Sequence, residues 1–180
     1  MKQNIQEKIE IPEEVELEIN GGGIKVSSNG REIIKRINLK NIKIKKEGKT
    51  LILESENAGK RESKMLHTAK AHIKNMIKGV KENFVYNLEI AFVHFPMNVE
   101  IKGENLIIKN FLGEKKSRTC RILPGTEVKI SGKLITVQSH NKEFAGQMAA
   151  NIEKATKTRN KDKRKFQDGI YITEKPGRII

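Results

Sequence analysis

The two halves of this 180-residue chain resemble each other at a constant shift of 84 positions, without a gap, over more than forty residues. At this shift, Gly48-Lys49 aligns with Gly132-Lys133. Farther along, the shift falls to 79 and places Ile73 on Ile152, so the first half carries about five extra residues before that point. Chance rarely keeps one register for so long. The repeat therefore predicts two related domains.

Within each half, the hydropathy pattern starts with the period of two that is typical of half-buried strands. In the first half, Val15, Leu17 and Ile19 alternate with polar residues before the turn signals Gly21-Gly22-Gly23 and Asn29-Gly30. The second half predicts strands at 99–101, 106–109, 128–131 and 134–138, with turns at Gly103, Gly113, Gly125 and Gly132. Short strands joined by tight turns indicate one small, mostly antiparallel sheet in each half.

Each half then changes to the 3.6-residue period of an amphipathic helix. From Lys60 onward, the apolar residues fall within an arc of about 120° opposite the cations, and Gly79 is a natural C-terminal stop. The second helix follows Asn141, a favourable N-cap. The apolar positions are Met65, Leu66, Ala69, Ile73, Met76 and Ile77, then Phe144, Ala145, Met148, Ala149, Ile152 and Ala155. We expect an α+β fold of two duplicated domains, residues 1–82 and 83–180, each with its sheet covered by one amphipathic helix.

The residues that join the two halves, 81–96, also have a strand-like composition. They include Tyr86, Leu88, Ile90 and Phe92. A flexible tether would instead be rich in Gly and Ser. We therefore expect a packed strand and a hinge in this segment.

Motifs for catalysis, metal binding and cofactor binding are missing from the sequence. Cys120 is the only cysteine, so the chain has no internal disulfide and no CxxC pair, which fits a reducing compartment. The histidines show no HExxH spacing; they are His67, His72, His94 and His140. Gly21-Gly22-Gly23 lacks the ending of a P-loop, and the carboxylates of residues 10–18 alternate along a solvated strand. We expect no metal, no cofactor and no enzymatic activity.

The composition favours a polyanionic partner. The chain has 36 Lys and Arg against 22 Asp and Glu, a net charge of +14 that suits nucleic acid or an acidic membrane surface. Residues 1–82 carry a net charge of +6 and residues 83–180 a net charge of +8. The N-terminus has no apolar signal region, and no apolar run approaches the roughly 18 residues of a membrane span. Secretion and membrane insertion are therefore disfavoured.

The cations of the second half are concentrated in two stretches. Residues 154–165 contain seven cations against Asp162 alone and have no apolar periodicity, which predicts an extended loop. Residues 115–121 form a second basic stretch in the same domain, so the two can converge on phosphates. The candidate contacts are Lys115, Lys116, Arg118, Arg121, Lys157, Arg159, Lys161, Lys163, Arg164 and Lys165. Their guanidinium groups favour RNA, since these bind phosphate bidentately and stack on bases. The alternative, for this loop and more so for the first helix, is a merely solvated surface.

Three segments resemble a known family. HFPMNVEIKGENLIIKNFLGEK, KDKRKFQDGIYITEK and AHIKNMIKGV are closely similar to the archaeal and eukaryotic branch of large-subunit ribosomal protein six. The resemblance extends from about Ile11 to Lys175, and residues 161–175 are its most specific part. The duplicated architecture agrees with it independently.

The resemblance implies a structural, non-catalytic constituent of the large ribosomal subunit in the cytoplasm. It implies that the second domain binds large-subunit rRNA near the sarcin-ricin loop and the translation-factor site, with neighbouring large-subunit proteins and translation factors close by. Carried over by position, the rRNA contacts are the ten cations named above. Asp168-Gly169 and Tyr171 are expected to fix the returning tail by packing.

Two alternatives stay open at this point. The first is a nucleic-acid-binding module of the same fold that acts outside the ribosome; a preference of the purified protein for duplex DNA over rRNA fragments would favour it. The second is an enzyme that uses Cys120 or a histidine, which the missing motifs disfavour.

Overall fold

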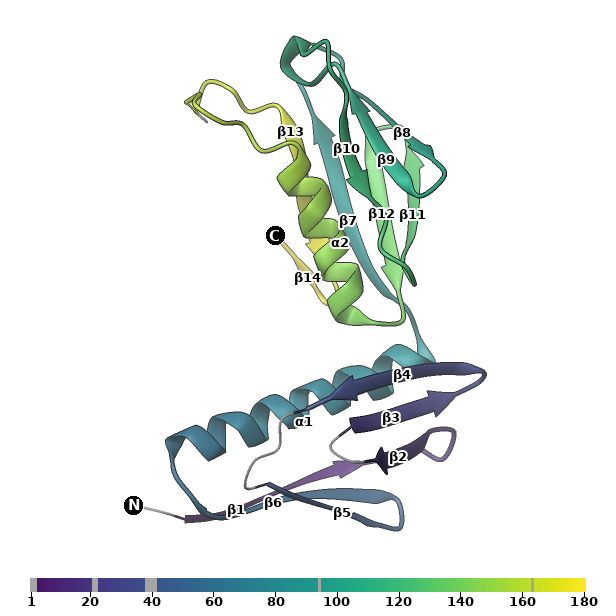
Figure 1. Cartoon of the computed structure of the whole chain (residues 1–180), viewed down its shortest axis with the longest axis vertical. Helices are drawn as coiled ribbons and strands as arrows, with labels where there is room; N and C mark the ends of the chain where they lie inside the picture. The colour runs from purple at the N-terminus through teal and green to yellow at the C-terminus, as the bar shows by residue number, and fades with distance from the viewer. Residues whose placement is uncertain (1–2, 21–22, 38–41, 94, 163) are drawn as a thin grey trace. The chain divides into compact units, whose positions relative to one another are not determined.

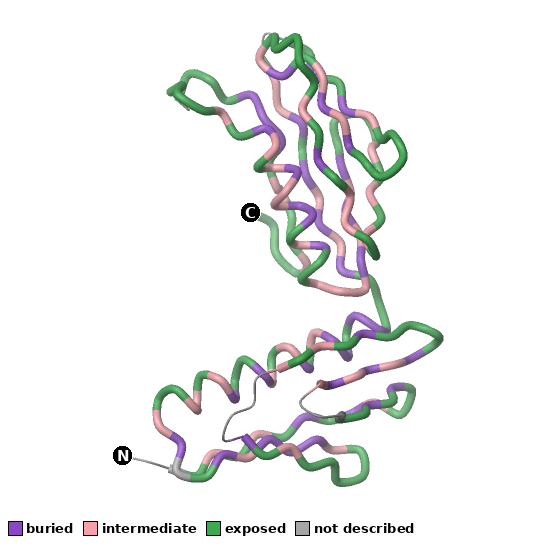
Figure 2. Tube along the Cα trace, viewed as in Figure 1, coloured by how far each residue is buried: buried purple, intermediate pink, exposed green. Residues whose placement is uncertain are grey.

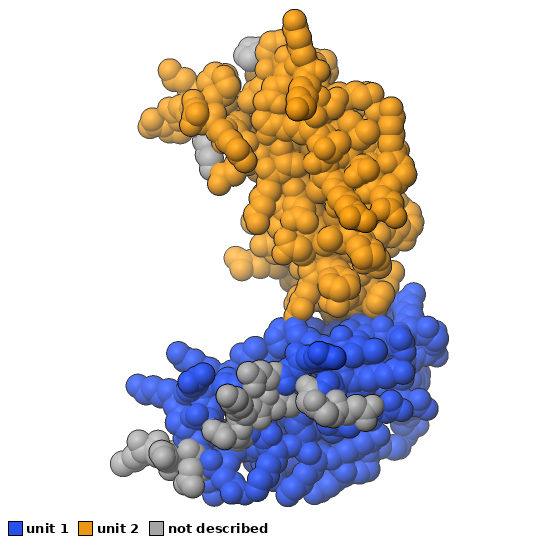
Figure 3. All heavy atoms as spheres, in the orientation of Figure 1, with its two compact units in different colours: residues 1–82 blue, residues 83–180 orange. Residues whose placement is uncertain are grey.

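The computed structural model describes residues 3–20, 23–37, 42–93, 95–162 and 164–180. The chain divides into two compact units, Met1–Glu82 and Asn83–Ile180, which Figure 3 distinguishes by colour. Each unit combines antiparallel sheets with one long helix, so the predicted α+β fold class is confirmed.

Unit 1 contains six strands followed by one helix (Figure 1). In chain order these are β1 (Gln3–Glu10), β2 (Glu16–Asn20), β3 (Gly23–Ser28), β4 (Arg31–Arg36), β5 (Lys43–Glu47), β6 (Thr50–Ala58) and α1 (Lys60–Lys81). The strands form two antiparallel three-stranded sheets in the orders β1-β6-β5 and β2-β3-β4. The helix contacts both sheets, most extensively through β6 and β3.

Unit 2 follows the same plan with an addition at its end (Figure 1). Its elements are β7 (Phe84–Ala91), β8 (Asn98–Lys102), β9 (Asn105–Lys109), a 3-10 turn η1 (Phe111–Gly113), β10 (Arg118–Arg121), β11 (Glu127–Ser131), β12 (Leu134–Ser139), α2 (Lys142–Ala155), β13 (Gly169–Lys175) and β14 (Arg178–Ile179). The sheets have the orders β11-β12-β7-β13-β14 and β10-β9-β8. The order β11-β12-β7 repeats β5-β6-β1, and β10-β9-β8 repeats β4-β3-β2, so the sequence repeat is also a repeat of topology.

One expectation differs from the structure, because each unit contains two sheets and not one. Alternating apolar residues show that one face of a strand is buried, but they do not show which strand lies beside it. In both units the apolar faces of the two sheets and of the helix meet in a single core. The same alternation therefore fits one sheet or two.

The cores explain why each helix forms where it does. Leu66 and Ile73 of α1 are fully buried, as are Met148 and Ile152 of α2, whereas the opposite faces of both helices are exposed (Figure 2). The N-cap prediction for α2 is confirmed, since the side chain of Asn141 accepts a hydrogen bond from the backbone N–H of Glu143 at 2.9 Å. Each unit thus buries its own apolar stripe.

The predicted end of the first helix is wrong. Gly79 lies inside α1 and is buried, and the helix continues to Lys81. Val80 is 1% exposed and extends the apolar stripe, so packing outweighs the tendency of Gly to end a helix. Glu82 is the C-cap of the helix: its backbone is extended, and its N–H donates to the carbonyl of Lys78.

The joining segment contains the predicted packed strand. β7 is the central strand of its five-stranded sheet, between β12 and β13, and Leu88 on it is fully buried. The hydropathy pattern predicts no strand in the first ten residues, where the structure contains β1 paired with β6. Only Ile5 and Ile9 mark that strand, because polar residues fill most of its other positions. Gly21 and Gly22, in the predicted turn between β2 and β3, lie outside the described residues.

Candidate nucleic-acid interface

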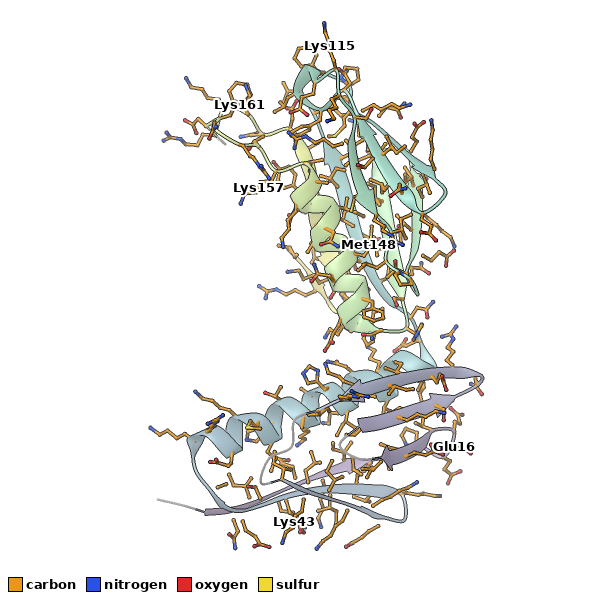
Figure 4. All side chains as sticks on the ribbon, viewed as in Figure 1. Glu16, Lys43, Lys115, Met148, Lys157 and Lys161 are labelled. Atoms are coloured by element: carbon orange, nitrogen blue, oxygen red, sulfur yellow. The ribbon has the colours of Figure 1, made fainter. Side chains whose placement is uncertain are left out.

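Two loops at one end of unit 2 hold most of the predicted contacts. One connects β9 to β10 and carries Lys115 and Lys116; the other connects α2 to β13 and carries Lys157 and Lys161. All four of these lysines are exposed. Figure 4 shows Lys115, Lys157 and Lys161 directed away from the body of unit 2, whereas Met148 lies beneath α2. Both loops are anchored at each end by elements that pack in the core of unit 2: β9 and β10 for the first loop, and α2 and β13 for the second.

Arg118 joins the two loops. Its Nη1 donates hydrogen bonds to the carbonyl oxygens of Ala155 at 2.8 Å and Lys157 at 3.3 Å, although these residues are 37 and 39 positions away in the sequence. A groove lies between the loops and takes its lining from both of them: Ser117, Arg118, Thr119, Lys154, Ala155, Lys157 and Arg159. The structure therefore brings the two basic stretches together, as their placement in one domain had suggested.

The other contacts of Arg118 lie within the protein. Its Nε and Nη2 donate to the two carboxylate oxygens of Glu114 at 2.8 and 2.6 Å, and the guanidinium lies 4.2 Å from the ring centroid of Phe111. The charged hydrogen bond from Arg118 lowers the pKa of Glu114 below its ordinary value. Because all three nitrogens of this guanidinium donate to acceptors within the protein, Arg118 holds the two loops together.

The loop after α2 has its own local structure. Asp162 accepts hydrogen bonds from the backbone N–H of Arg164 and from its guanidinium, both at about 3 Å, while the side chain of Arg164 is 91% exposed. The ammonium of Lys161 lies 4.5 Å from the ring centroid of Phe166. These contacts shape the loop and leave its cations facing outward. Lys163 lies outside the described residues.

Buried polar contacts anchor both ends of this loop. Asp168 is 6% exposed, and its carboxylate accepts a hydrogen bond from the backbone N–H of Val93 at 3.2 Å. The hydroxyl of Thr156 accepts a hydrogen bond from the backbone N–H of Ile170 at 2.8 Å. The hydroxyl of Tyr171 donates to the carbonyl of Gln167 at 3.0 Å. The expected packing role of Asp168 and Tyr171 agrees with these contacts, and Thr156 is a further anchor that the sequence analysis missed. Its place directly after the last residue of the helix was the available signal.

Arg121 lies apart from the groove. It is three residues beyond Arg118 on β10, so its side chain points to the opposite face of the strand. It forms an ion pair with Glu104 at 3.3 Å, and both side chains are 79% exposed. Arg159 lines the groove, and Lys165 is exposed on the loop after α2. Nine of the ten predicted contacts are described residues, and Arg121 is the one among these nine that faces elsewhere.

The structure offers little to catalysis. Cys120 is 7% exposed, and burial raises the pKa of its thiol, so the nucleophilic thiolate is disfavoured at neutral pH. Within the described ranges, no three His, Cys, Asp or Glu side chains gather as a metal site would require. No helix in the same ranges is both long and apolar enough to cross a bilayer.

Comparisons with known proteins point to one family. The family model described as ribosomal protein L6 matches residues 95–169, which include both basic loops. The protein named large ribosomal subunit protein uL6 of Methanococcus vannielii is 47% identical over 176 residues, covering 98% of this chain and 97% of that protein. The proteins of the same name from Aeropyrum pernix and Methanobrevibacter smithii are 42% and 40% identical, covering 96% and 95% of this chain and 95% and 96% of their own lengths. Similarity at this level over nearly the whole length, together with a duplicated α+β fold, shows that the chain belongs to the ribosomal protein L6 family.

Proposed function

We propose that unit 2 binds large-subunit rRNA through the two basic loops and the groove between them, near the sarcin-ricin loop and the translation-factor site. As a member of the ribosomal protein L6 family, the chain is a structural, non-enzymatic constituent of the large ribosomal subunit and binds its rRNA and proteins. The proposal concerns which surface does so.

The groove is the observation that carries this proposal. Lys154 at the end of α2 and Lys157 and Arg159 in the loop after it line one side, and Ser117 and Thr119 at the start of β10 line the other. Arg118 donates hydrogen bonds to the backbone carbonyls of Ala155 and Lys157, so these two acceptors are already satisfied without the cations that line the groove. A row of cations along a hollow follows a phosphate backbone more closely than the same charges scattered on a convex surface.

The residues proposed to contact rRNA divide by role. Those directed to phosphates are Lys115, Lys116, Lys157, Arg159, Lys161, Lys163, Arg164 and Lys165, and Arg118 positions them. Arg121 would contribute only if the RNA extends around the other face of β10. Phe166 beneath Lys161 offers a ring on which an unpaired base could stack.

Salt dependence of rRNA binding tests the proposal. The full chain with Lys157→Gln, Arg159→Gln and Lys161→Gln should bind a large-subunit rRNA fragment with a log–log salt slope shallower by about 2 to 3, since each lost phosphate contact removes about 0.7 to 0.9. The matched control is Lys102→Gln, Lys129→Gln and Lys175→Gln, which removes equal charge from the strands of unit 2. Equal slopes for the two variants, or a preference of the native chain for duplex DNA over rRNA, would contradict the proposal.

The position near translation factors needs a separate measurement. A photoreactive group placed at Lys115, the outermost labelled side chain of the first loop (Figure 4), should crosslink to the sarcin-ricin region in assembled subunits. A translation factor should appear among the crosslinked products when it is bound. Crosslinks only to distant rRNA domains would contradict this part.

A further inference from the structure

The excess positive charge of unit 1 is confined to one helix. Unit 1 contains eighteen Lys and Arg against twelve Glu, and α1 alone contains seven of these cations and a single acidic residue, Glu62. The rest of the unit therefore has eleven cations and eleven anions and is neutral. If the lysines served only to keep the surface solvated, cations and anions would be interspersed over the whole unit, and the excess would not be concentrated on one helix.

Five of the seven cations of α1 form a line along its exposed face. Residues at spacings of four and three occupy this line, which we call the lysine stripe: Lys60, Lys64, Lys74, Lys78 and Lys81, with His67 and Ala71 between them. All seven of these positions are exposed, and the stripe spans about 32 Å at 1.5 Å per residue. Because the drift is only about 20° per heptad, the stripe stays on one side of the helix.

Acidic side chains neutralise less of the charge of the stripe than of the charge of the sheet lysines. Lys25, Lys43 and Lys45 form ion pairs with Glu32, Glu56 and Glu54 at 2.8 to 3.2 Å. By contrast, Lys60, Lys64 and Lys74 form no ion pair with any residue that the structure describes. Lys78 and Lys81 form exposed ion pairs with Glu82 and Glu14 at 3.5 and 3.3 Å.

A groove runs beside the stripe. It lies between β1 and α1 and contains four lysines and one carboxylate among its lining residues: Lys8, Ile9, Glu10, Pro12, Lys74, Ile77, Lys78 and Lys81. Lys8 and Glu10 contribute from the strand, whereas Lys74, Lys78 and Lys81 line the helix side, where the cations gather. Such a hollow concentrates positive potential more than the stripe would alone.

We propose that the lysine stripe and this groove form a second RNA-binding surface, in which α1 lies along a phosphate backbone. The chemistry of the face favours a polyanion over a protein partner. None of the large exposed apolar side chains among the described residues belongs to α1, and protein interfaces are depleted in Lys and enriched in aromatic residues. The proposal extends RNA binding to unit 1 and does not require the site of unit 2 to be correct.

The test compares two four-lysine variants of the full chain. The stripe variant is Lys60→Gln, Lys64→Gln, Lys74→Gln and Lys78→Gln; Gln and Lys have similar helix propensities, so the helix is retained. The matched control, also in unit 1, is Lys25→Gln, Lys43→Gln, Lys45→Gln and Lys49→Gln, whose native side chains are all ion-paired. The probe is protein-free large-subunit rRNA, and the readout is the salt dependence of affinity, with circular dichroism confirming that each variant folds.

We expect the stripe variant to bind with a slope shallower by about 3 and the control to change it by less than 1. Equal changes in the two variants, or an unchanged slope in the stripe variant, would overturn the proposal. The loop variant of unit 2 distinguishes the two surfaces. If the loop variant binds normally and the stripe variant does not, the function proposed for unit 2 fails and the inference about the lysine stripe stands. If the stripe variant binds normally and the loop variant does not, the inference about the stripe fails and the function proposed for unit 2 stands.

Discussion

Units 1 and 2 share one topology and place their positive charge in different structures. In unit 1 the excess charge lies on α1, whereas α2 is neutral, with Lys142 and Lys154 balanced by Glu143 and Glu153. In unit 2 more than half of the excess lies in the loop after the helix and in the loop before β10. The buried faces of the two helices are equivalent, and their exposed faces are not. Packing therefore fixes the fold of each unit and leaves the charge of the exposed surface free to differ between them.

The strand arrangement differs at one sheet edge. In unit 1, β1 is an edge strand with exposed charged residues such as Lys8 and Glu10. In unit 2 the corresponding strand, β7, is covered by β13, and the basic loop is the connection that brings β13 there. The loop thus exists because unit 2 closes an edge that unit 1 leaves open.

The strongest test of the equivalence of the cores uses aligned residues. Ile73 in α1 and Ile152 in α2 are aligned in the repeat and are both 0% exposed. Replacing either one with Ala should cost about 2 to 5 kcal/mol, because each leaves a cavity in a closed core. Denaturant unfolding of the two variants measures both costs. A loss below about 1 kcal/mol for only one of them would show that the cores are not equivalent.

A smaller effect on stability is expected when the hydrogen bonds of Arg118 between the two basic loops of unit 2 are removed. Arg118→Ala removes the hydrogen bonds to Ala155 and Lys157 and leaves Glu114 without its partner, so unit 2 should lose about 1 to 3 kcal/mol. Arg121→Ala on the same strand is the control, and its exposed ion pair predicts a change within about 0.5 kcal/mol. Thermal unfolding checks the pair; similar losses would show that Arg118 does not organise the loops.

The smallest effect concerns acid stability in unit 1. A hydrogen bond from Lys70 lowers the pKa of Glu7 below its ordinary value of 4.5. Since the folded pKa lies below the unfolded one, this stabilisation is present above pH 4.5 and is lost as the pH falls through the folded value. Between pH 5 and pH 3, the native chain should lose more stability than Glu7→Gln. Lys70→Gln should flatten the profile in the same way, and identical profiles for all three chains would contradict the assignment.

Local signals in the sequence were sufficient for much of the fold. The hairpin β11–β12 follows from the alternation on both sides of Gly132, and α2 follows from its apolar stripe and Asn141. Features that depend on distant residues were not predicted. The division into two sheets depends on which strands pair, and the continuation of α1 past Gly79 depends on how Val80 packs.

The candidate site divides in the same way. Charge density alone located the two basic loops, because an unbalanced run of cations is visible without any knowledge of the fold. The positioning role of Arg118 was not visible, because its acceptors are backbone carbonyls almost forty residues away. The separation of Arg121 from the groove follows from strand geometry once β10 is placed.

The central position of β7 has a consequence for synthesis of the chain. Every strand pairing of unit 1 forms among its own 82 residues, so this unit can become compact while translation of unit 2 continues. In unit 2, the pairing of β7 with β13 cannot form until β13 has left the exit tunnel, almost eighty residues after β7. Until then one side of β7 is an unpaired apolar edge, and a nascent chain stalled at that stage would be a natural client for a chaperone.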